Sequence, residues 1–334
     1  LRDSSNKNIT FLDNIMIHNI AGTEGGCAHI EQSKHIYIKR SVFMKNIART
    51  SGGVLYARNV KAINKVNSSF LFGKTGVSGA VSLVEKTNVI QNIMCRFIEN
   101  EAAKHGGAFI LLDIITIRNI DVKFVRNSAG ENGAVVYFVG SSFFIESDCV
   151  ILQNFAGHFG GAFYISSKEE KCTVKIDQSY FIDNYANNDG LVGSLEFCNF
   201  IIIKDCLFVE NRSVTDVNQG ILFIPTYVHL THTVFLHTSF YFNKSHTPSK
   251  IISTFGYDQN IIGNATDKYF NEDSIRNLVC LYQIHISFSD TRIIGCRNNL
   301  VNFLENTKPI LAFELLVTFG CPAFHILRHE VSNY

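Results

Sequence analysis

Acidic side chains are the first residues in this chain that could do chemistry. Paired carboxylates cleave glycosidic bonds and clustered ones bind calcium, so both need several acids on one face. The candidates are Asp113, Asp121, Asp177, Asp183 and Asp205. They fall at different offsets within the repeat described below, and the chain lacks the Asn-Thr-Asp, Asp-Asp and Gly-His-Gly signatures of polysaccharide hydrolases. We expect no catalytic residues and no enzyme.

Histidines invite a metal interpretation that their spacing does not favour. His229, His232 and His237 are three and five residues apart, which on a strand places successive side chains on opposite faces. His105 and His158 each precede a glycine step and are two repeats apart. A structural zinc site would use a cysteine pair or one helical turn. We therefore expect solvated histidines, no metal and no cofactor.

The cysteines can be sorted by their position in the repeat. Cys95, Cys149 and Cys206 share one offset but are two repeats apart, about 10 Å, which is too far for a disulfide. Cys172 and Cys198 lie one repeat apart and are disulfide candidates, as are Cys296 and Cys321. The total of 9 is odd, so at least one thiol stays unpaired within the chain.

These residues are set in a repeat whose step is 27 residues at first and 27 to 33 later. An apolar marker, usually Phe, begins the motif, and an asparagine follows three positions on. The markers are Met16, Phe43, Phe70, Phe97, Phe124, Ile151, Phe181, Phe208, Phe240, Phe270 and Phe303. The asparagines are Asn19, Asn46, Asn100, Asn127, Asn154, Asn184, Asn211, Asn243 and Asn306, with Gly73 and Asp273 as exceptions. A fixed period of this kind indicates stacked repeat units.

The segments between markers decide which repeat this is. They are short, β-branched and aromatic, and are separated by Asn, Gly and Ser, with no helical periodicity. We therefore predict an all-β, right-handed parallel β-helix of about 11 coils with three short strands per coil. Phe would stack on Phe in the core and Asn on Asn in a ladder, where asparagine would also accept the left-handed backbone of a bend. A small residue and then a glycine step follow each asparagine and would turn the next corner.

One column of the repeat leaves two interpretations open. The residue after the marker is apolar in nearly every coil, although strict alternation would point it outward. Either the strand bends and both residues pack inside, or the column is an exposed apolar stripe that docks against a neighbour. The column runs Ile17, Met44, Leu71, Ile98, Val125, Leu152, Ile182, Val209 and Leu304.

Composition excludes some partners and favours export. A net charge of +1 without charged runs predicts neither nucleic acid nor anionic membranes as partners. No apolar run reaches the length of a membrane span, and a secretory signal would already have been removed. Five Asn-x-Ser/Thr triplets and the cysteines favour an extracellular location. Asn8, Asn67 and Asn264 are the glycosylation candidates, because Asn211 and Asn243 belong to the ladder.

Three segments carry a family resemblance: "FIEN…GGAFI", "FVRN…NGAVV" and "FIDN…DGLVG". Their Phe-x-x-Asn and Gly-Gly-Ala-apolar pattern resembles the repeats of chlamydial polymorphic outer-membrane proteins and of protist and ciliate surface proteins. The resemblance implies a right-handed β-helix displayed outside the cell, with adhesion as the usual role. The chain lacks the carboxy-terminal barrel of the chlamydial proteins, and its composition is closer to the protist relatives.

Domain organisation and function follow from the repeat. Residues 1–313 form the β-helix, regular over 10–255 and irregular over 256–313, and residues 314–334 form an apolar closing segment or assembly contact. Each coil bonds only to its neighbours, so an uncovered end offers unpaired backbone groups to another chain. We expect a head-to-tail homopolymer, a surface or secreted filament. The alternatives are an adhesin that binds glycans or a host surface, and a polysaccharide lyase or hydrolase.

Overall fold

The computed structural model describes the stacked part of the chain. It covers residues 2–3, 7–140, 142–167, 172–209, 211, 220–224, 232–236, 239–241 and 250–253. All of them lie within one compact unit that ends at Asp267. Predictions that concern the later residues, among them Asn243, Asn264, Phe270, Cys296, Phe303, Asn306, Cys321 and the boundary after residue 313, lie outside the described residues.

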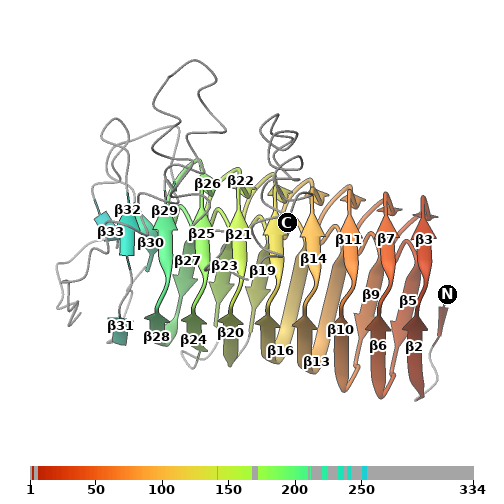
Figure 1. The fold of residues 1–334 in the computed structure, drawn as a ribbon. Coiled ribbons are helices and arrows are strands. Elements are labelled where there is room, and N and C mark those ends of the chain that lie inside the picture. Colours follow the sequence, from red (N-terminus) through yellow and green to blue (C-terminus); the bar gives the residue numbers. More distant parts are fainter. Residues whose placement is uncertain are drawn as a thin grey trace, which may run out of the picture. The chain divides into compact units, whose positions relative to one another are not determined.

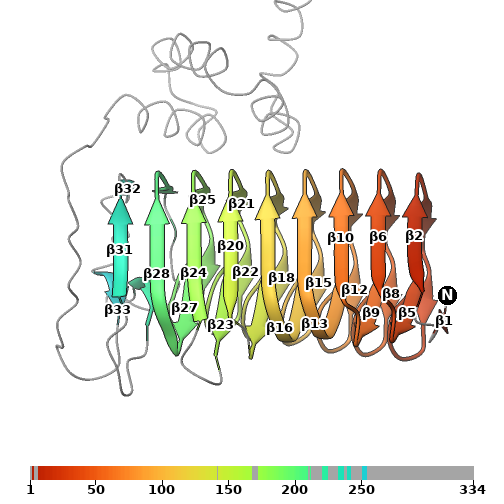
Figure 2. The same ribbon diagram turned by 90° about the horizontal axis from the view of Figure 1, so that it is seen from below.

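The described residues form an all-β solenoid whose strands stack in parallel (Figure 1). Three sheets run along the stack, with 17, 9 and 7 strands, here called sheets 1, 2 and 3. Every pairing between named strands is parallel, which confirms the predicted parallel β-solenoid. Seven turns contribute a strand to all three sheets, as the strand count of sheet 3 shows. Figure 2 shows the same stack from below, with strands at regular spacing from β2 to β31.

Sheet 1 holds two strand segments per turn, separated by a bend. The segments before the bend are β1 (Arg2–Asp3), β5 (Ala28–Glu31), β9 (Leu55–Arg58), β19 (Val136–Val139), β23 (Phe163–Ser166), β27 (Gly193–Glu196), β30 (Gly220–Phe223) and β33 (Lys250–Ser253). Those after it are β2 (Asn8–Leu12), β6 (His35–Lys39), β10 (Ala62–Val66), β20 (Phe143–Ser147), β24 (Cys172–Asp177), β28 (Cys198–Lys204) and β31 (His232–Leu236). The long strands β13 (Ser82–Ile93) and β16 (Phe109–Ile120) continue through the bend. Most turns thus contain four strand segments, one more than predicted.

Sheets 2 and 3 are built from shorter strands. Sheet 2 contains β3 (Ile15–Ile17), β7 (Val42–Met44), β11 (Ser69–Leu71), β14 (Arg96–Ile98), β17 (Lys123–Val125), β21 (Val150–Leu152), β25 (Tyr180–Ile182), β29 (Leu207–Val209) and β32 (Ser239–Tyr241). Sheet 3 contains β4 (Ile20–Ala21), β8 (Ile47–Ala48), β12 (Lys74–Thr75), β15 (Glu101–Ala102), β18 (Ser128–Ala129), β22 (Phe155–Ala156) and β26 (Tyr185–Ala186). The marker residue is the middle residue of every sheet 2 strand.

Left-handed residues make the corners, and their position corrects the sequence-based explanation of the asparagines. Positive φ falls on the residue before each ladder position from Asn19 to Asn184, for example Glu99 (φ 53°) before Asn100 and Arg126 (φ 52°) before Asn127. The asparagines themselves are not left-handed. They are therefore selected for their amides, whereas the glycine step does have the predicted positive φ, as at Gly52 (φ 68°).

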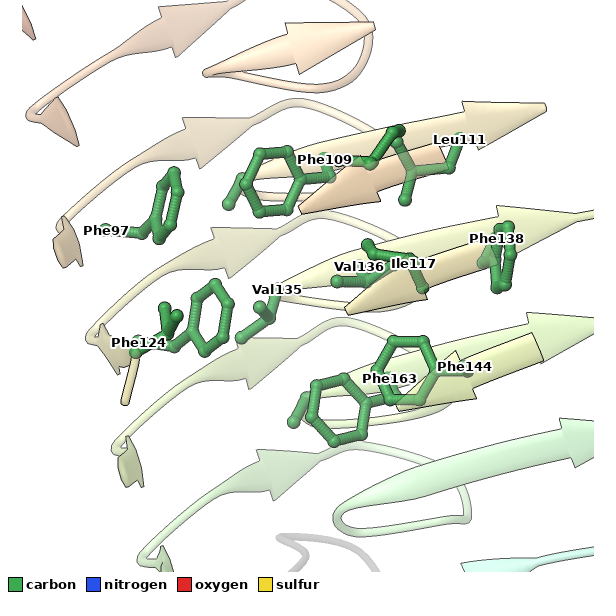
Figure 3. Packing of buried hydrophobic residues seen from close by; sticks show 14 of the residues in the cluster. Phe97, Phe109, Leu111, Ile117, Phe124, Val135, Val136, Phe138, Phe144 and Phe163 are labelled. Atoms are coloured by element: carbon green, nitrogen blue, oxygen red, sulfur yellow. The ribbon is translucent and has the colours of Figure 1, made fainter. Parts of the chain in front are cut away.

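The core lies between the sheets and is continuous along the stack. Phe97 and Phe124 are register partners in adjacent turns and are fully buried. Phe109 meets Phe97 edge to face at 4.7 Å between ring centroids, which ties sheet 1 to sheet 2. Figure 3 shows these rings together with Phe144 and Phe163 of lower turns, all directed into the same interior. Burial of this apolar surface is the main term that holds neighbouring turns together.

Candidate functional site

The asparagines form a hydrogen-bonded column along one corner of the solenoid. Asn100 uses its backbone N–H and its Nδ2 to donate to Asn127 Oδ1, at 3.1 and 2.9 Å. Asn127 repeats both bonds to Asn154 Oδ1, at 2.9 and 3.0 Å. From Asn46 onward each amide also donates to a carbonyl of the previous turn, as Asn127 Nδ2 does to Phe97 O at 2.9 Å. The column comprises Asn19, Asn46, Asn100, Asn127, Asn154, Asn184 and Asn211 within the described residues.

Gly73 interrupts this column without breaking the backbone contact. Its N–H donates to Asn100 Oδ1 at 2.9 Å, so the acceptor of the next turn is still used. The amide donation that a side chain at this position would add is missing. Gly73 also lacks the side-chain oxygen that Asn46 would bond to, so the column is interrupted between Asn46 and Gly73 and resumes with the Gly73 N–H.

The marker phenylalanines stack face to face. Ring centroids are 5.1 Å apart for Phe43 and Phe70, and 4.9 Å for Phe70 and Phe97. Phe97 and Phe124 follow at 5.2 Å, and further down Phe181 and Phe208 stack at 4.6 Å. All of these rings are essentially inaccessible to solvent, and Phe208 is the register partner of Phe240.

The column after the marker lies on the face opposite the rings. Val125, Leu152, Ile182 and Val209 are buried but do not belong to the core cluster that contains the phenylalanines. At the other end of the column Ile17 is 46% exposed. Neither of the two open interpretations holds along the whole column, because its residues are buried in the later turns and Ile17 is exposed in the first. Exposure is limited to the first turns.

One premise about the acidic candidates needs correction. Asp121 and Asp205 share an offset, three residues before the marker, and Asp148 shares it too. All three have positive φ, between 49° and 54°, so they occupy the corner before sheet 2. Asp residues accept this left-handed backbone more readily than most side chains, which explains the shared position without any joint chemistry. Asp113 occupies a different corner, with φ 57°.

The described histidines lie among aromatic and acidic side chains. His105 stacks on Tyr137 at 4.5 Å between ring centroids, and its Nε2 lies 3.3 Å from Glu131 Oε2. Burial lowers the pKa of His105 although Glu131 acts in the opposite direction. His158 is exposed, while His229 and His237 lie outside the described residues. The part of the chain that the structure describes contains no group of three side chains able to hold a metal ion.

Cys172 and Cys198 occupy opposite positions in adjacent strands. They are register partners at the start of β24 and β28, and both are buried free thiols, so no disulfide joins them in this structure. The hydrogen bond between the thiols of Cys198 and Cys172, together with burial, raises the pKa of Cys198. The ladder shifts register between Cys172 and Thr173, and such an irregularity is a place where the backbone can adjust.

The remaining cysteines of the repeat are corner residues with a hydrogen-bonding role. Cys95, Cys149 and Cys206 are buried, and each thiol donates to the carbonyl two residues earlier, at 3.1 to 3.3 Å. Ser68 and Ser179 make the same bond at this offset in other turns, at 2.9 and 2.8 Å. The sequence analysis assigned these cysteines no polar role, and the serines that share their offset were the signal for it.

The Asn-x-Ser/Thr asparagines differ in solvent exposure according to whether they belong to the asparagine ladder. Asn67 is exposed at a corner with φ 44°, and Asn8 is exposed at the start of β2. Asn211 is 1% exposed and donates its amide to Phe181 O at 2.9 Å, which leaves no room for a sugar.

Comparisons with known proteins do not assign this chain to a family. The chain matches no protein-family model, no curated protein and no solved structure. In the part of the chain that the structure describes, there is no helix with the length and apolar character needed to cross a bilayer.

Proposed function

We propose that this chain is a non-catalytic structural protein of the cell exterior, a β-solenoid whose copies associate head to tail. The proposal rests on the structural roles of the repeated residues. The asparagines bond along the stack and the phenylalanines pack within it, so the side chains that recur most regularly have structural roles. Among the described residues, the acids and histidines do not form a group able to hold a metal ion.

The first described turn has the properties of an association surface. β3 pairs with β7 and β4 with β8, and within the described residues neither has a partner on its other side. Asn19 donates to Asn46 Oδ1 but receives no such bond from a preceding turn of the described chain. Strand edges of this kind pair readily with further strands. A turn from a second copy could donate to Asn19 in the same way that Asn19 donates to Asn46.

Microscopy of the purified chain tests this association. We expect fibres in negative stain, and monodisperse short particles at high concentration would contradict the proposal. A charge at the edge strand should oppose pairing, so Ile15→Lys in β3, where Ile15 is 72% exposed, should shorten the fibres. Ile115→Lys is the matched control, because Ile115 is 51% exposed but lies in a strand paired on both sides, and it should leave the fibres unchanged.

Handedness and length are part of the same proposal. We infer a right-handed solenoid because crossovers between parallel strands of one sheet are right-handed in almost all proteins. We also infer about 11 turns, since the markers Phe270 and Phe303 continue the period beyond the described strands. The resemblance of the Phe-x-x-Asn repeats to surface proteins supports display outside the cell.

Export has its own support and its own test. The exposed Asn67 is a favourable acceptor, whereas Asn211 is buried. When the chain passes through a eukaryotic secretory pathway, we expect Asn67→Gln to remove one glycan and Asn211→Gln to remove none. Absence of any glycan at Asn67 would contradict the assignment of Asn67 as an acceptor site.

Adhesion is the second candidate, and an aromatic strip on the outer face of sheet 1 favours it. Tyr137 and Tyr164 stack at 4.9 Å, His105 extends the strip, and both tyrosines remain partly exposed. Aromatic faces beside polar groups are suitable for contact with sugar rings. Binding of soluble single particles to glycans, lost in Tyr164→Ala, would support this candidate. Binding that is unchanged in that variant would contradict it.

A further inference from the structure

One inward-facing column of sheet 1 is polar in four consecutive turns. The column contains Phe11, Ile38, Lys65, Asn92, Asn119, Glu146, Ile176 and Ile203, and each residue is the register partner of the next. Lys65, Asn92, Asn119 and Glu146 each have 0% exposure. The inward column two residues earlier is apolar, as at Ile63, Ile90 and Ile117 in the same turns. The polar residues thus lie inside the core rather than at its boundary.

The two asparagines point their amides in the same direction. Asn92 Nδ2 donates to Asn119 Oδ1 at 2.6 Å, and Asn119 Nδ2 donates to Glu146 Oε1 at 2.6 Å. The donors therefore face the carboxyl group, and the acceptor Asn92 Oδ1 faces the lysine. Neither Lys65 Nζ nor Asn92 Oδ1 has a hydrogen-bond partner within the described residues. Because the two residues are register partners, a rotation of the lysine side chain would complete the chain of bonds.

The side chains around the column are apolar, so each polar residue would cost free energy if it lost its partner. Lys65 Nζ lies 4.5 Å from the ring centroid of Phe109 and 5.8 Å from that of Phe70, and the titratable group beside it is Cys95. At the other end the Cys149 thiol is the titratable group beside Glu146. Burial lowers the pKa of Lys65 and raises that of Glu146. A buried polar group that loses its partner is strongly destabilising.

We propose that Lys65, Asn92, Asn119 and Glu146 form a register key, a buried polar column that allows only one alignment of the turns that carry it. Apolar alternation alone does not fix this alignment. A slip of one residue turns every side chain to the wrong face, but a slip of two residues keeps the inward set inward. With a slip of two, Asn92 would lie opposite Ile117 or Asp121, and its amide would lose its partner. The polar column therefore excludes a slip that the hydrophobic pattern permits.

Disulfide trapping in the full-length chain measures the alignment directly. Gln91 and Arg118 are register partners on the outer face, so the pair Q91C and R118C reports the native alignment. Thr116 is the native partner of Val89, so the pair Q91C and T116C reports a slip of two residues. Brief oxidation followed by peptide mapping gives the yield of each cross-link. In the otherwise unchanged chain we expect the first cross-link and almost none of the second.

Removing the column should raise the yield of the slipped cross-link. The variant K65I/N92I/N119I/E146I makes the column apolar, like its neighbours Ile38 and Ile176, and replacement of buried polar groups by apolar ones often preserves a fold. We expect it to fold and to show about a tenfold increase in the Q91C–T116C cross-link. The control I63L/I90L/I117L alters the neighbouring apolar column and should show no increase.

Three outcomes of this experiment would overturn the proposal. A folded quadruple variant whose slipped cross-link stays at the level of the unchanged chain overturns the proposal. A quadruple variant that does not fold also overturns it, because the column would then be needed for stability as such. An equal rise in the control would mean that any change in the core loosens the alignment, and would overturn the proposal too.

Discussion

Asn127 donates twice to one oxygen of Asn154, through its backbone N–H at 2.9 Å and through Nδ2 at 3.0 Å. A single acceptor in one turn thus holds both the main chain and the side chain of the turn before it. The first prediction follows from this double bond. Asn127→Ala removes the Nδ2 donor and the Oδ1 acceptor and leaves Asn100 and Phe97 O without their partners, so the free energy of unfolding should fall by about 3 kcal/mol.

Urea unfolding monitored by circular dichroism measures this loss. Asn64→Ala is the control, since Asn64 is partly exposed on the outer side of β10, and its effect should stay within about 0.5 kcal/mol. Equal losses in the two variants would show that the asparagine column contributes no specific stability.

The second prediction concerns the phenylalanine stack. Phe124→Ala should lower the free energy of unfolding by about 4 kcal/mol, because Phe124 is fully buried between Phe97 and the edge of Phe109. Phe143→Ala is the matched control at a position that is 45% exposed, and it should cost less than about 1 kcal/mol. Denaturation midpoints measured side by side provide the check, and a cost at Phe124 no greater than at Phe143 would contradict the stacked core.

The third prediction is a pH dependence of stability with two windows. Burial raises the pKa of Glu146 from 4.5 to about 8, so the folded state holds the extra proton and its contribution to stability is lost as pH rises from 4.5 to 8. Burial lowers the pKa of Lys65 from 10.5 to about 7, so the folded state holds fewer protons and stability is regained as pH rises from 7 to 10.5. Each slope should approach about 1.4 kcal/mol per pH unit.

Two variants isolate these windows. Glu146→Gln should remove the decline between pH 4.5 and 8, and Lys65→Met should remove the rise between pH 7 and 10.5. Free energies of unfolding measured across this range are the readout. A profile that neither variant changes would mean that these groups keep their ordinary pKa values in the folded chain.

The fourth prediction is a disulfide between Cys172 and Cys198 under oxidising conditions. Their positions as register partners satisfy the distance that the bond needs, and a disulfide exchanger such as oxidised glutathione would take up the two electrons and the protons. Peptide mapping without reduction should find this pair linked, whereas Cys95 and Cys149 should stay reduced because they lie two turns apart. A Cys95–Cys149 link, or none at Cys172 after oxidation, would contradict the geometry.

Much of the fold can be read from spacing alone. Residues 27 apart, such as Phe97 and Phe124, were predicted to lie above one another, and they do. The prediction succeeded because the core residues and the corner residues recur with the same period. The left-handed position was misplaced because Asn is a common left-handed residue, and in a single sequence this preference cannot be told from selection for its amide.

The polar column shows what sequence reasoning missed. Lys65 and Glu146 are charged residues in strands of mixed character, and such residues usually face solvent. Their offset, five residues before the marker, was the available signal, because Asn92 and Asn119 share it in the turns between them. The prediction of three strands per coil holds in the turns of β13 and β16, whose long strands continue through the bend, and is wrong where the bend divides sheet 1 into two segments.

The uniform 27-residue step of the early turns has a consequence for how such a chain can grow. From β7 to β17 each strand of sheet 2 lies in register with the next without insertion or deletion. An in-frame copy of one such unit would enter the stack as a new layer and require no change in the others. Lengthening by gene duplication is thus open to this architecture almost anywhere, except across the layers from Lys65 to Glu146, where a copied layer would have to preserve the order of the polar side chains.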